Sequence, residues 1–292
     1  MCRLFGFRSV IASQVHRSLV DCENALVHQS EHHPDGWGVA YYVRNVPHVI
    51  KSARTAVADN LFQRVSGIVS SQTVVAHLRR ATTGQISMVN CHPFQYGHWI
   101  FAHNGQIPNF EQHREAFLER LMPELRRFVL GDTDSEVLFY LLLSHLAERT
   151  DPAEGSPSVD LLVEAAEKTV EDVHEITGEN CYRSTTKEQL YLSFLLTDGR
   201  AMVGHQGGKQ LFYSTHKTRC PERGECPSFS KVCEMAVDTG KVNHMIFSSE
   251  PLSGDNVWQE MAPGQIVAVD RGMNLHMHNE PRLEAVAAAG AE

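Results

Sequence analysis

Apolar residues recur along the chain with two different periods, and each period predicts a different kind of element. Short runs that are rich in β-branched and aromatic side chains, bounded by glycine or polar residues, predict strands. The predicted strands are Cys2–Phe7, Gly38–Val43, Thr73–Arg79, Trp99–Ala102, Leu190–Thr197, Ala201–Gly204, Gln210–Ser214, Met245–Ser248 and Gln265–Asp270.

Longer segments carry apolar residues three or four positions apart, which is the period of an amphipathic helix. The predicted helices are Leu19–Ser30, Asn60–Val69, Phe110–Val129, Ser135–Glu148 and Val159–Thr177. Strands come first, a block of helices follows, and strands return. This order predicts an α+β fold in which helices are layered on largely antiparallel sheets, instead of repeated βαβ units.

Composition limits the partners and the compartment. The chain has 292 residues, 42% of them hydrophobic, enough for one large domain or two small ones. A net charge of −9 argues against nucleic acid as a partner, because phosphate binding needs clustered lysine and arginine. No run is apolar enough for a membrane span, and no signal peptide is evident. Seven irregularly spaced cysteines do not form a secreted disulfide framework, so we expect a cytoplasmic protein with reduced thiols.

Two clusters of polar residues and glycine lie next to predicted strands. "HPDGWGVAYY" (His33–Tyr42) indicates a tight turn that leads into a strand with a packed tryptophan. "VVAHLRRATTG" (Val74–Gly84) indicates a strand whose end releases Arg79, Arg80 and Thr82. Its arginines are either a solvated pair or a clamp for an anion, since guanidinium groups bind carboxylates in a bidentate manner.

A third cluster, "WIFAHNGQI" (Trp99–Ile107), ends a hydrophobic strand with His-Asn-Gly. Asn104 and Gly105 form either a hairpin turn or an oxyanion hole, because an amide side chain beside a glycine N–H supplies two hydrogen-bond donors. Downstream, "GDTDSEVL" (Gly131–Leu138) indicates the start of a helix with aspartate and serine as caps. If one of its two aspartates caps the helix, the other is available to bind a cation.

The opening "MCRLFGF" places Cys2 where removal of one methionine would make it the first residue. A buried core thiol is the ordinary alternative. Combined with Arg79, Asn104, Gly105 and Asp134, however, Cys2 fits acyl transfer from an amino-acid amide. The five residues would supply a nucleophile, a carboxylate clamp, an oxyanion hole and an acceptor for an ammonium group.

The order Met-Cys, His-x-Arg-x-Ala-Thr, His-Asn-Gly and Thr-Asp-Ser-Glu resembles that of the class II glutamine amidotransferases, which are N-terminal nucleophile enzymes. "CHPF" (Cys91–Phe94) and "AHNGQI" (Ala102–Ile107) are similar to the short YafJ-like branch and to the ergothioneine-pathway γ-glutamyl amidohydrolase. The segment Glu250–Gln265 continues the likeness, so the resemblance covers nearly the whole chain.

This resemblance implies a four-layer αββα sandwich over residues 1–280, followed by a flexible tail over 281–292. It implies that Cys2 is the nucleophile after Met1 is removed, with its own α-amine as the base. Asn104 and Gly105 would form the oxyanion hole. Arg79, with Thr82 beside it, would bind the substrate α-carboxylate, and Asp134 the α-ammonium. No cofactor and no metal are expected.

Three functions are compatible with these residues. The leading hypothesis is hydrolysis of a small-molecule γ-glutamyl amide, without a second substrate. The second is the amidotransferase subunit of a complex with a partner protein, and the third is a non-catalytic, metal-binding relative. Arg80 and Thr83 stand where synthase-linked members usually have Trp and His, which predicts an altered pocket wall. The spacing of Cys220, Cys226 and Cys233 fits no usual zinc pair and predicts a surface insertion.

Overall fold

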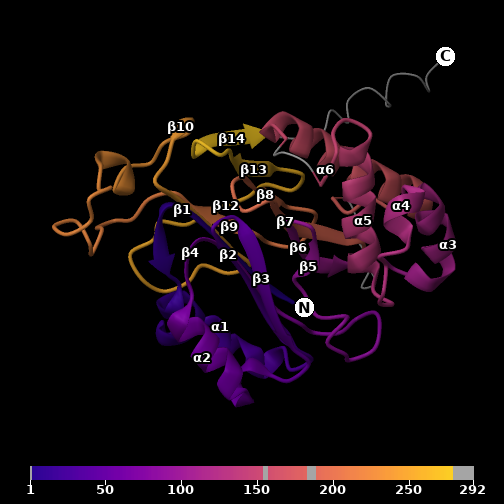
Figure 1. The fold of residues 1–292 in the computed structure, drawn as a ribbon, viewed down its shortest axis with the longest axis horizontal. Coiled ribbons are helices and arrows are strands. Elements are labelled where there is room, and N and C mark those ends of the chain that lie inside the picture. Colours follow the sequence, from indigo (N-terminus) through magenta and orange to yellow (C-terminus); the bar gives the residue numbers. More distant parts are fainter. Residues whose placement is uncertain (1, 154–156, 183–188, 279–292) are drawn as a thin grey trace.

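Two seven-stranded sheets form the centre of the computed structural model, which describes residues 2–153, 157–182 and 189–278 (Figure 1). In the first sheet the strands lie in the order β12-β9-β11-β1-β4-β2-β3. Their bounds are β1 Arg3–Gln14, β2 Trp37–Val43, β3 Val46–Ser52, β4 Ser70–Leu78, β9 Phe212–Ser214, β11 His244–Ser248 and β12 Gln259–Glu260. The strand that follows Cys2 is therefore central, paired with β11 on one side and β4 on the other.

The second sheet has the order β10-β14-β13-β8-β7-β6-β5. Its strands are β5 Phe94–Tyr96, β6 Trp99–Gln106, β7 Tyr191–Thr197, β8 Met202–His205, β10 Gly240–Lys241, β13 Ile266–Val269 and β14 Asn274–His278. All the strand pairs are antiparallel, as the order of elements predicts.

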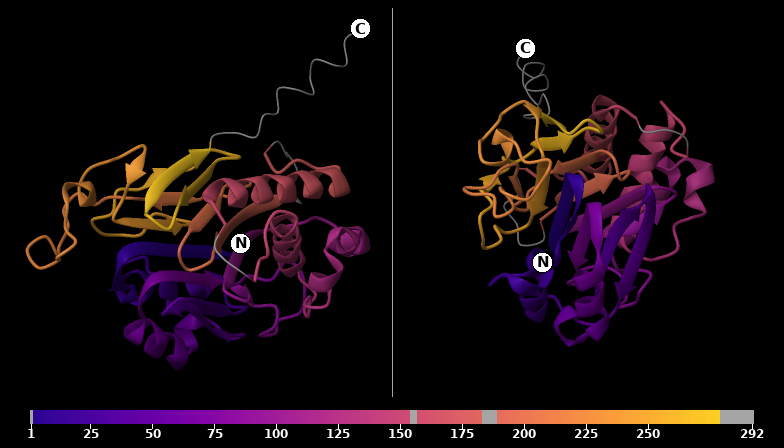
Figure 2. Two further views of the ribbon diagram at one scale, coloured as in Figure 1. Left: turned by 45° about the horizontal axis from the view of Figure 1, so that its top comes forward. Right: turned by 60° about the vertical axis from the view of Figure 1, so that its left-hand side comes forward.

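Helices cover the outer face of each sheet (Figure 2). Helices α1 (Leu26–Gln29) and α2 (Asn60–Ile68) pack on the first sheet, where they share a hydrophobic core with β1, β2 and β4. The second sheet is covered by α3 (Phe110–Arg120), α4 (Pro123–Arg126), α5 (Asp134–Ala147) and α6 (Val159–Thr177). A third core fills the space between the sheets. The architecture is the αββα sandwich that the family resemblance implies.

Alternation along β6 decides which side chains face the site. Ile100 and Ala102 point into the core between the sheets, whereas Trp99 and Phe101 point toward the helices. Because successive strand residues point to opposite faces, Asn104 shares the face of Ala102. It therefore points toward the first sheet, which carries Cys2.

Several predicted elements differ in the structure. Residues 19–30 do not form one helix but a π-helical turn, Arg17–Asp21, and the short α1. The predicted helix Phe110–Val129 divides into α3 and α4 at Pro123, because proline has no N–H for a helix interior and favours the first turn. The predicted strand Trp99–Ala102 continues to Gln106 as β6.

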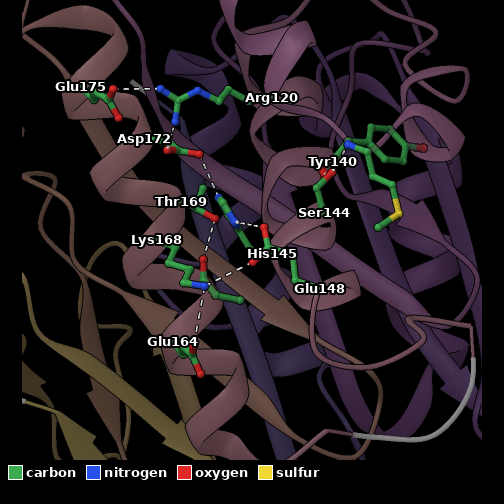
Figure 3. A network of polar contacts seen from close by, with 12 residues as sticks. Arg120, Tyr140, Ser144, His145, Glu148, Glu164, Lys168, Thr169, Asp172 and Glu175 are labelled. Atoms are coloured by element: carbon green, nitrogen blue, oxygen red, sulfur yellow. Dashed lines mark hydrogen bonds and ion pairs between the residues drawn. The ribbon is translucent and has the colours of Figure 1, made fainter.

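A polar network joins α3, α5 and α6 (Figure 3). Arg120 of α3 pairs with Asp172 and Glu175 of α6. His145 of α5 lies 3.0 Å from Asp172, and Lys168 of α6 lies 3.3 Å from Glu148. These contacts hold the helical layer together on its exposed side, while α5 is buried almost throughout.

No helix within the described residues is long and apolar enough to cross a membrane. The linker candidate Asp151–Ser158 lies only partly within these residues, and the expected tail 281–292 lies outside them.

Candidate active site

Cys2 directly precedes β1, and only 8% of its surface is exposed. Its Sγ accepts a hydrogen bond from the Arg80 N–H at 3.3 Å and lies 3.5 Å from the Arg80 carbonyl oxygen. The backbone that follows β4 therefore holds the thiol. The residue pattern alone predicts Cys2 and this loop but not the contact between them.

The turn at Asp35 supports this loop. Its carboxylate accepts a hydrogen bond from the Ala81 N–H at 2.8 Å. The backbone of the turn adds two more bonds, from the Arg79 N–H to the Gly36 oxygen and from the Asp35 N–H to the Arg79 oxygen. "HPDG" is thus a tight turn, as predicted, but it also positions the backbone that contacts Cys2. The residue pattern does not indicate that the turn has this second role.

Burial raises the pKa of the Cys2 thiol above its ordinary value. The hydrogen bond from Arg80 and the positive charge of Arg79 oppose this effect, and the negative charge of Asp134 adds to it. The buried thiol is therefore protonated at neutral pH, and a nucleophilic role requires a base. These interactions also place Arg79 and Asp134 within electrostatic reach of Cys2.

Asn104 connects the second sheet to β1, the strand that directly follows Cys2. Its Nδ2 donates to the hydroxyl of Ser249 at 3.4 Å, and the same hydroxyl accepts the Leu4 N–H at 2.8 Å. A third bond runs from the Ser249 N–H to the Leu4 carbonyl oxygen. Ser249, which sequence reasoning missed, therefore bridges Asn104 and β1.

Gly105 lies within β6, so the hairpin-turn alternative for Asn-Gly is wrong. In the pairing of β6 with β7, Gly105 lies opposite Leu192. The Leu192 N–H donates to the Gly207 carbonyl oxygen, and the Leu192 carbonyl oxygen accepts a hydrogen bond from the His205 ring. Both Leu192 groups thus point toward β8, and the backbone groups of Gly105 must point to the opposite edge of β6. A Cβ at this position would collide with the Tyr191 carbonyl oxygen, which explains the glycine.

The same edge of β6 carries the neighbouring backbone groups. The His103 carbonyl lies 3.2 Å from Nε2 of His77, and the Ile107 N–H donates to Asp134 at 2.8 Å. The Gly105 N–H lies between them, beyond the end of β5, which pairs only as far as Phe101. A backbone N–H and an amide side chain are the kinds of donor that an oxyanion hole uses.

Asp134 begins α5, and its carboxylate is only partly occupied. One oxygen accepts the Ile107 N–H, and the other accepts the N–H and hydroxyl of Ser135. A carboxylate has about four acceptor sites, so capacity remains for one more donor. The helix cap is Thr133, whose hydroxyl accepts the Glu136 N–H, and not the aspartate or serine predicted from the sequence.

Arg79 is 3% exposed, and its guanidinium is held by its own loop. It donates to the carbonyl oxygens of Thr83 at 3.0 Å, Gly84 at 3.4 Å and Gln85 at 3.1 Å. A guanidinium has five N–H donors, so these three bonds leave donors for an anion. The solvated-pair alternative is therefore wrong for Arg79, although Arg80 is exposed.

A cavity of about 530 Å³ opens beside these groups. It is lined by residues 82–84, which include Thr82, and by residues 106–112, which include the Ile107 that binds Asp134. A cavity of this size admits a small molecule. It is the candidate substrate cavity.

A larger cavity, of about 620 Å³, lies at the other end of β1, beside His244. Cys220, Cys226 and Cys233 are among its lining residues. Within residues 2–153, 157–182 and 189–278, no group of histidine, cysteine and acidic residues is arranged to hold a metal ion.

Comparison with known proteins identifies the family. The family model for class-II glutamine amidotransferases matches residues 1–291, so the chain belongs to this family of enzymes.

Individual relatives agree with this assignment. The chain is 30% identical over 223 residues to the probable glutamine amidotransferase DUG3 of Saccharomyces cerevisiae, covering 70% of this chain and 62% of that protein. It is 24% identical to the putative glutamine amidotransferase YafJ of Escherichia coli, over 91% of this chain and 96% of the relative. A glutamine aminotransferase class-II domain protein from Silicibacter pomeroyi has the same fold, with a TM-score of 0.61 at 22% identity over 96% of this chain and 100% of that one.

Proposed function

We propose that this chain hydrolyses the γ-glutamyl amide bond of glutamine or a γ-glutamyl compound, releasing glutamate and ammonia or an amine. The observation that carries the proposal is the hydrogen-bonded link from Asn104 through Ser249 to Leu4. This link joins a candidate oxyanion donor to the strand that follows the thiol. Acyl transfer needs these two parts in a fixed relative position.

Cys2 is the proposed nucleophile. Because burial raises the pKa of its thiol, attack requires a base. In a chain that begins at Cys2, the α-amine, with an intrinsic pKa of ~8, is that base. It takes the thiol proton as Sγ bonds to the substrate carbonyl carbon, and the proton passes to the leaving nitrogen. Water then attacks the thioester, which releases glutamate and restores the thiol.

Asn104 and Gly105 supply the two donors to the tetrahedral oxyanion. Loss of one such donor typically costs ~3–4 kcal/mol of transition-state stabilisation. The remaining N–H groups of Arg79 bind the substrate α-carboxylate, with Thr82 on the cavity wall beside it. Asp134 binds the α-ammonium through its remaining acceptor capacity. The proposal uses no cofactor and no metal.

We also propose that residues 1–280 act as one amidotransferase domain. In support, β14 pairs with β13 as far as His278 and lies in the same sheet as the oxyanion strand β6.

Glutamate release from the purified full chain tests the function. We expect release from glutamine or γ-glutamyl ethylamide without any second substrate. Cys2→Ala should abolish release, whereas the matched control Cys226→Ser, at the other end of β1, should retain it. Release that appears only after cell extract is added would favour the alternative, an amidotransferase subunit completed by a partner protein.

Intact-mass measurement on the active enzyme tests the base. We expect active protein to lack Met1, since the mechanism uses the amine of Cys2. Full activity in protein that uniformly retains Met1 would rule out the α-amine as the base.

A further inference from the structure

Lys209 lies between β8 and β9 and is half-buried. Its ammonium nitrogen is 3.1 Å from the centre of the Tyr191 ring. Burial alone lowers the pKa of Lys209 to about 8, and no carboxylate of the described residues opposes this shift. A partly desolvated ammonium group has capacity for an anion.

The backbone of Lys209 lies against the strand pair that carries the proposed oxyanion hole. Ser193 of β7 is directly opposite Asn104 of β6. The Ser193 hydroxyl accepts the Lys209 N–H at 3.1 Å and donates to the Lys209 carbonyl oxygen at 2.7 Å. Residues directly opposite in a sheet share a face, so Lys209 packs on the same face as Asn104. That is the face turned toward Cys2.

Lys209 and Asp134 lie on opposite sides of Asn104. Asp134 contacts the edge of β6 that points away from β7, through the Ile107 N–H. Lys209 lies on the β7 side, because its backbone contacts the hydroxyl of Ser193 in β7, and β7 is the strand paired with β6, at a spacing of ~4.8 Å. In the proposed binding mode, with the glutamyl group held by Arg79 and Asp134 and its carbonyl at Asn104, the leaving amine lies on the β7 side of Asn104, where Lys209 is.

From this arrangement we propose that Lys209 binds a carboxylate on the leaving amine, so that the substrates are γ-glutamyl amino acids or peptides in preference to neutral amides. The inference rests on the proposed function. The Tyr191 ring covers one side of the ammonium group, which limits the directions from which an anion can approach it. Lys209 is thus a specificity-determining residue, separate from the groups that bind the glutamyl moiety.

Two substrates that differ only in charge test this inference. γ-Glutamylglycine carries the carboxylate, and γ-glutamylglycinamide replaces it with a neutral amide of nearly the same shape. We expect kcat/KM to be about tenfold higher for γ-glutamylglycine, because a hydrogen bond between an ammonium group and a carboxylate is stronger than one to a neutral amide.

Variants assign the preference to Lys209. Lys209→Met should bring the ratio of the two kcat/KM values close to one, and Lys209→Arg should keep most of it. Lys241→Met, which removes an exposed lysine of β10, is the matched control and should keep the wild-type ratio.

Each contrary outcome has a distinct meaning. Cys2-dependent release of glutamate at equal kcat/KM from both amides would overturn this inference alone, as would an unchanged ratio in Lys209→Met. Release from glutamine but from neither amide would overturn this inference alone, whereas release from none of these compounds would overturn both this inference and the proposed function.

Discussion

The two sheets contribute to the candidate site in different ways. In the first sheet the chemical groups lie just outside the strands: Cys2 precedes β1 and Arg79 follows β4, and backbone atoms of the loop after β4 contact both. In the second sheet Asn104 and Gly105 lie inside β6, and Asp134 is the first residue of α5. Regular elements thus hold the proposed oxyanion hole, whereas a loop holds the proposed nucleophile and the proposed anion clamp.

This difference predicts that substitutions of the two kinds of group change kcat and KM in different ways. Donors fixed in a strand cost no reorganisation when charge develops on the substrate, so their loss should appear mainly in kcat. Arg79 is a proposed substrate-binding group held by a loop and contacts the substrate before reaction, so its loss should appear more strongly in KM. The four substitutions below test this division, from the largest expected effect to the smallest.

Asn104→Ala should have the largest effect. We expect kcat to fall roughly 100- to 1000-fold with little change in KM, because the lost hydrogen bond forms only in the transition state. Steady-state kinetics of glutamate release measures both constants. Asn60→Ala, on the exposed surface of α2, is the control. An unchanged kcat would show that Asn104 is not an oxyanion donor.

Arg79→Lys should raise KM by roughly tenfold or more and lower kcat less, because an ammonium group cannot reproduce a bidentate contact with a carboxylate. The substitution also removes bonds to the carbonyl oxygens of Thr83 and Gln85, so circular dichroism should verify the fold. Arg64→Lys in α2 is the matched control. If kcat fell instead and KM stayed constant, the clamp would act on the transition state.

Ser249→Ala should lower kcat by roughly three- to tenfold, since a neutral hydrogen bond contributes about 0.5–1.5 kcal/mol. The expected loss is smaller than for Asn104→Ala because the amide remains and loses only its orientation. Ser249→Thr keeps the hydroxyl and should restore most of the rate. Equal losses in the alanine and threonine variants would indicate a packing role instead of a hydrogen-bonding one.

Arg120→Met should change neither kcat nor KM. It removes ion pairs to Asp172 and Glu175 on the exposed side of the helical layer, where such pairs contribute about 0.2–1 kcal/mol. Thermal unfolding should detect a small decrease in the melting temperature. A decrease in kcat would mean that the helical layer influences the site, contrary to the division between the two sheets.

The elements with strong periodicity could be predicted from the sequence. The helix Val159–Thr177 matches α6 at both ends, and β7 matches its predicted strand within one residue. The segment Phe110–Val129 was predicted less well because the apolar spacing continues through Pro123, where the backbone cannot. Short strands such as β5, β10 and β12 have too few residues to show a period.

Candidate site residues could be named from the sequence, but their connections could not. Asn104 was identified by type and by family resemblance, yet Asn-Gly equally indicates a turn, and only pairing with β7 places it in a strand. Ser249 lies 145 positions from Asn104, and a lone serine carries no pattern. Which backbone groups meet across the two sheets depends on strand register, which a single sequence does not specify.

The bond between Leu4 and Ser249 joins residues that are 245 positions apart. During synthesis at about 5–20 residues per second, Ser249 is made roughly 12–50 s after Leu4. This contact beside Cys2 therefore cannot form until most of the chain has been made. In the folded protein Cys2 is 8% exposed, which obstructs access by a peptidase. Under the proposed mechanism, removal of Met1 thus competes in time with folding, and the delay before Ser249 is made favours the peptidase.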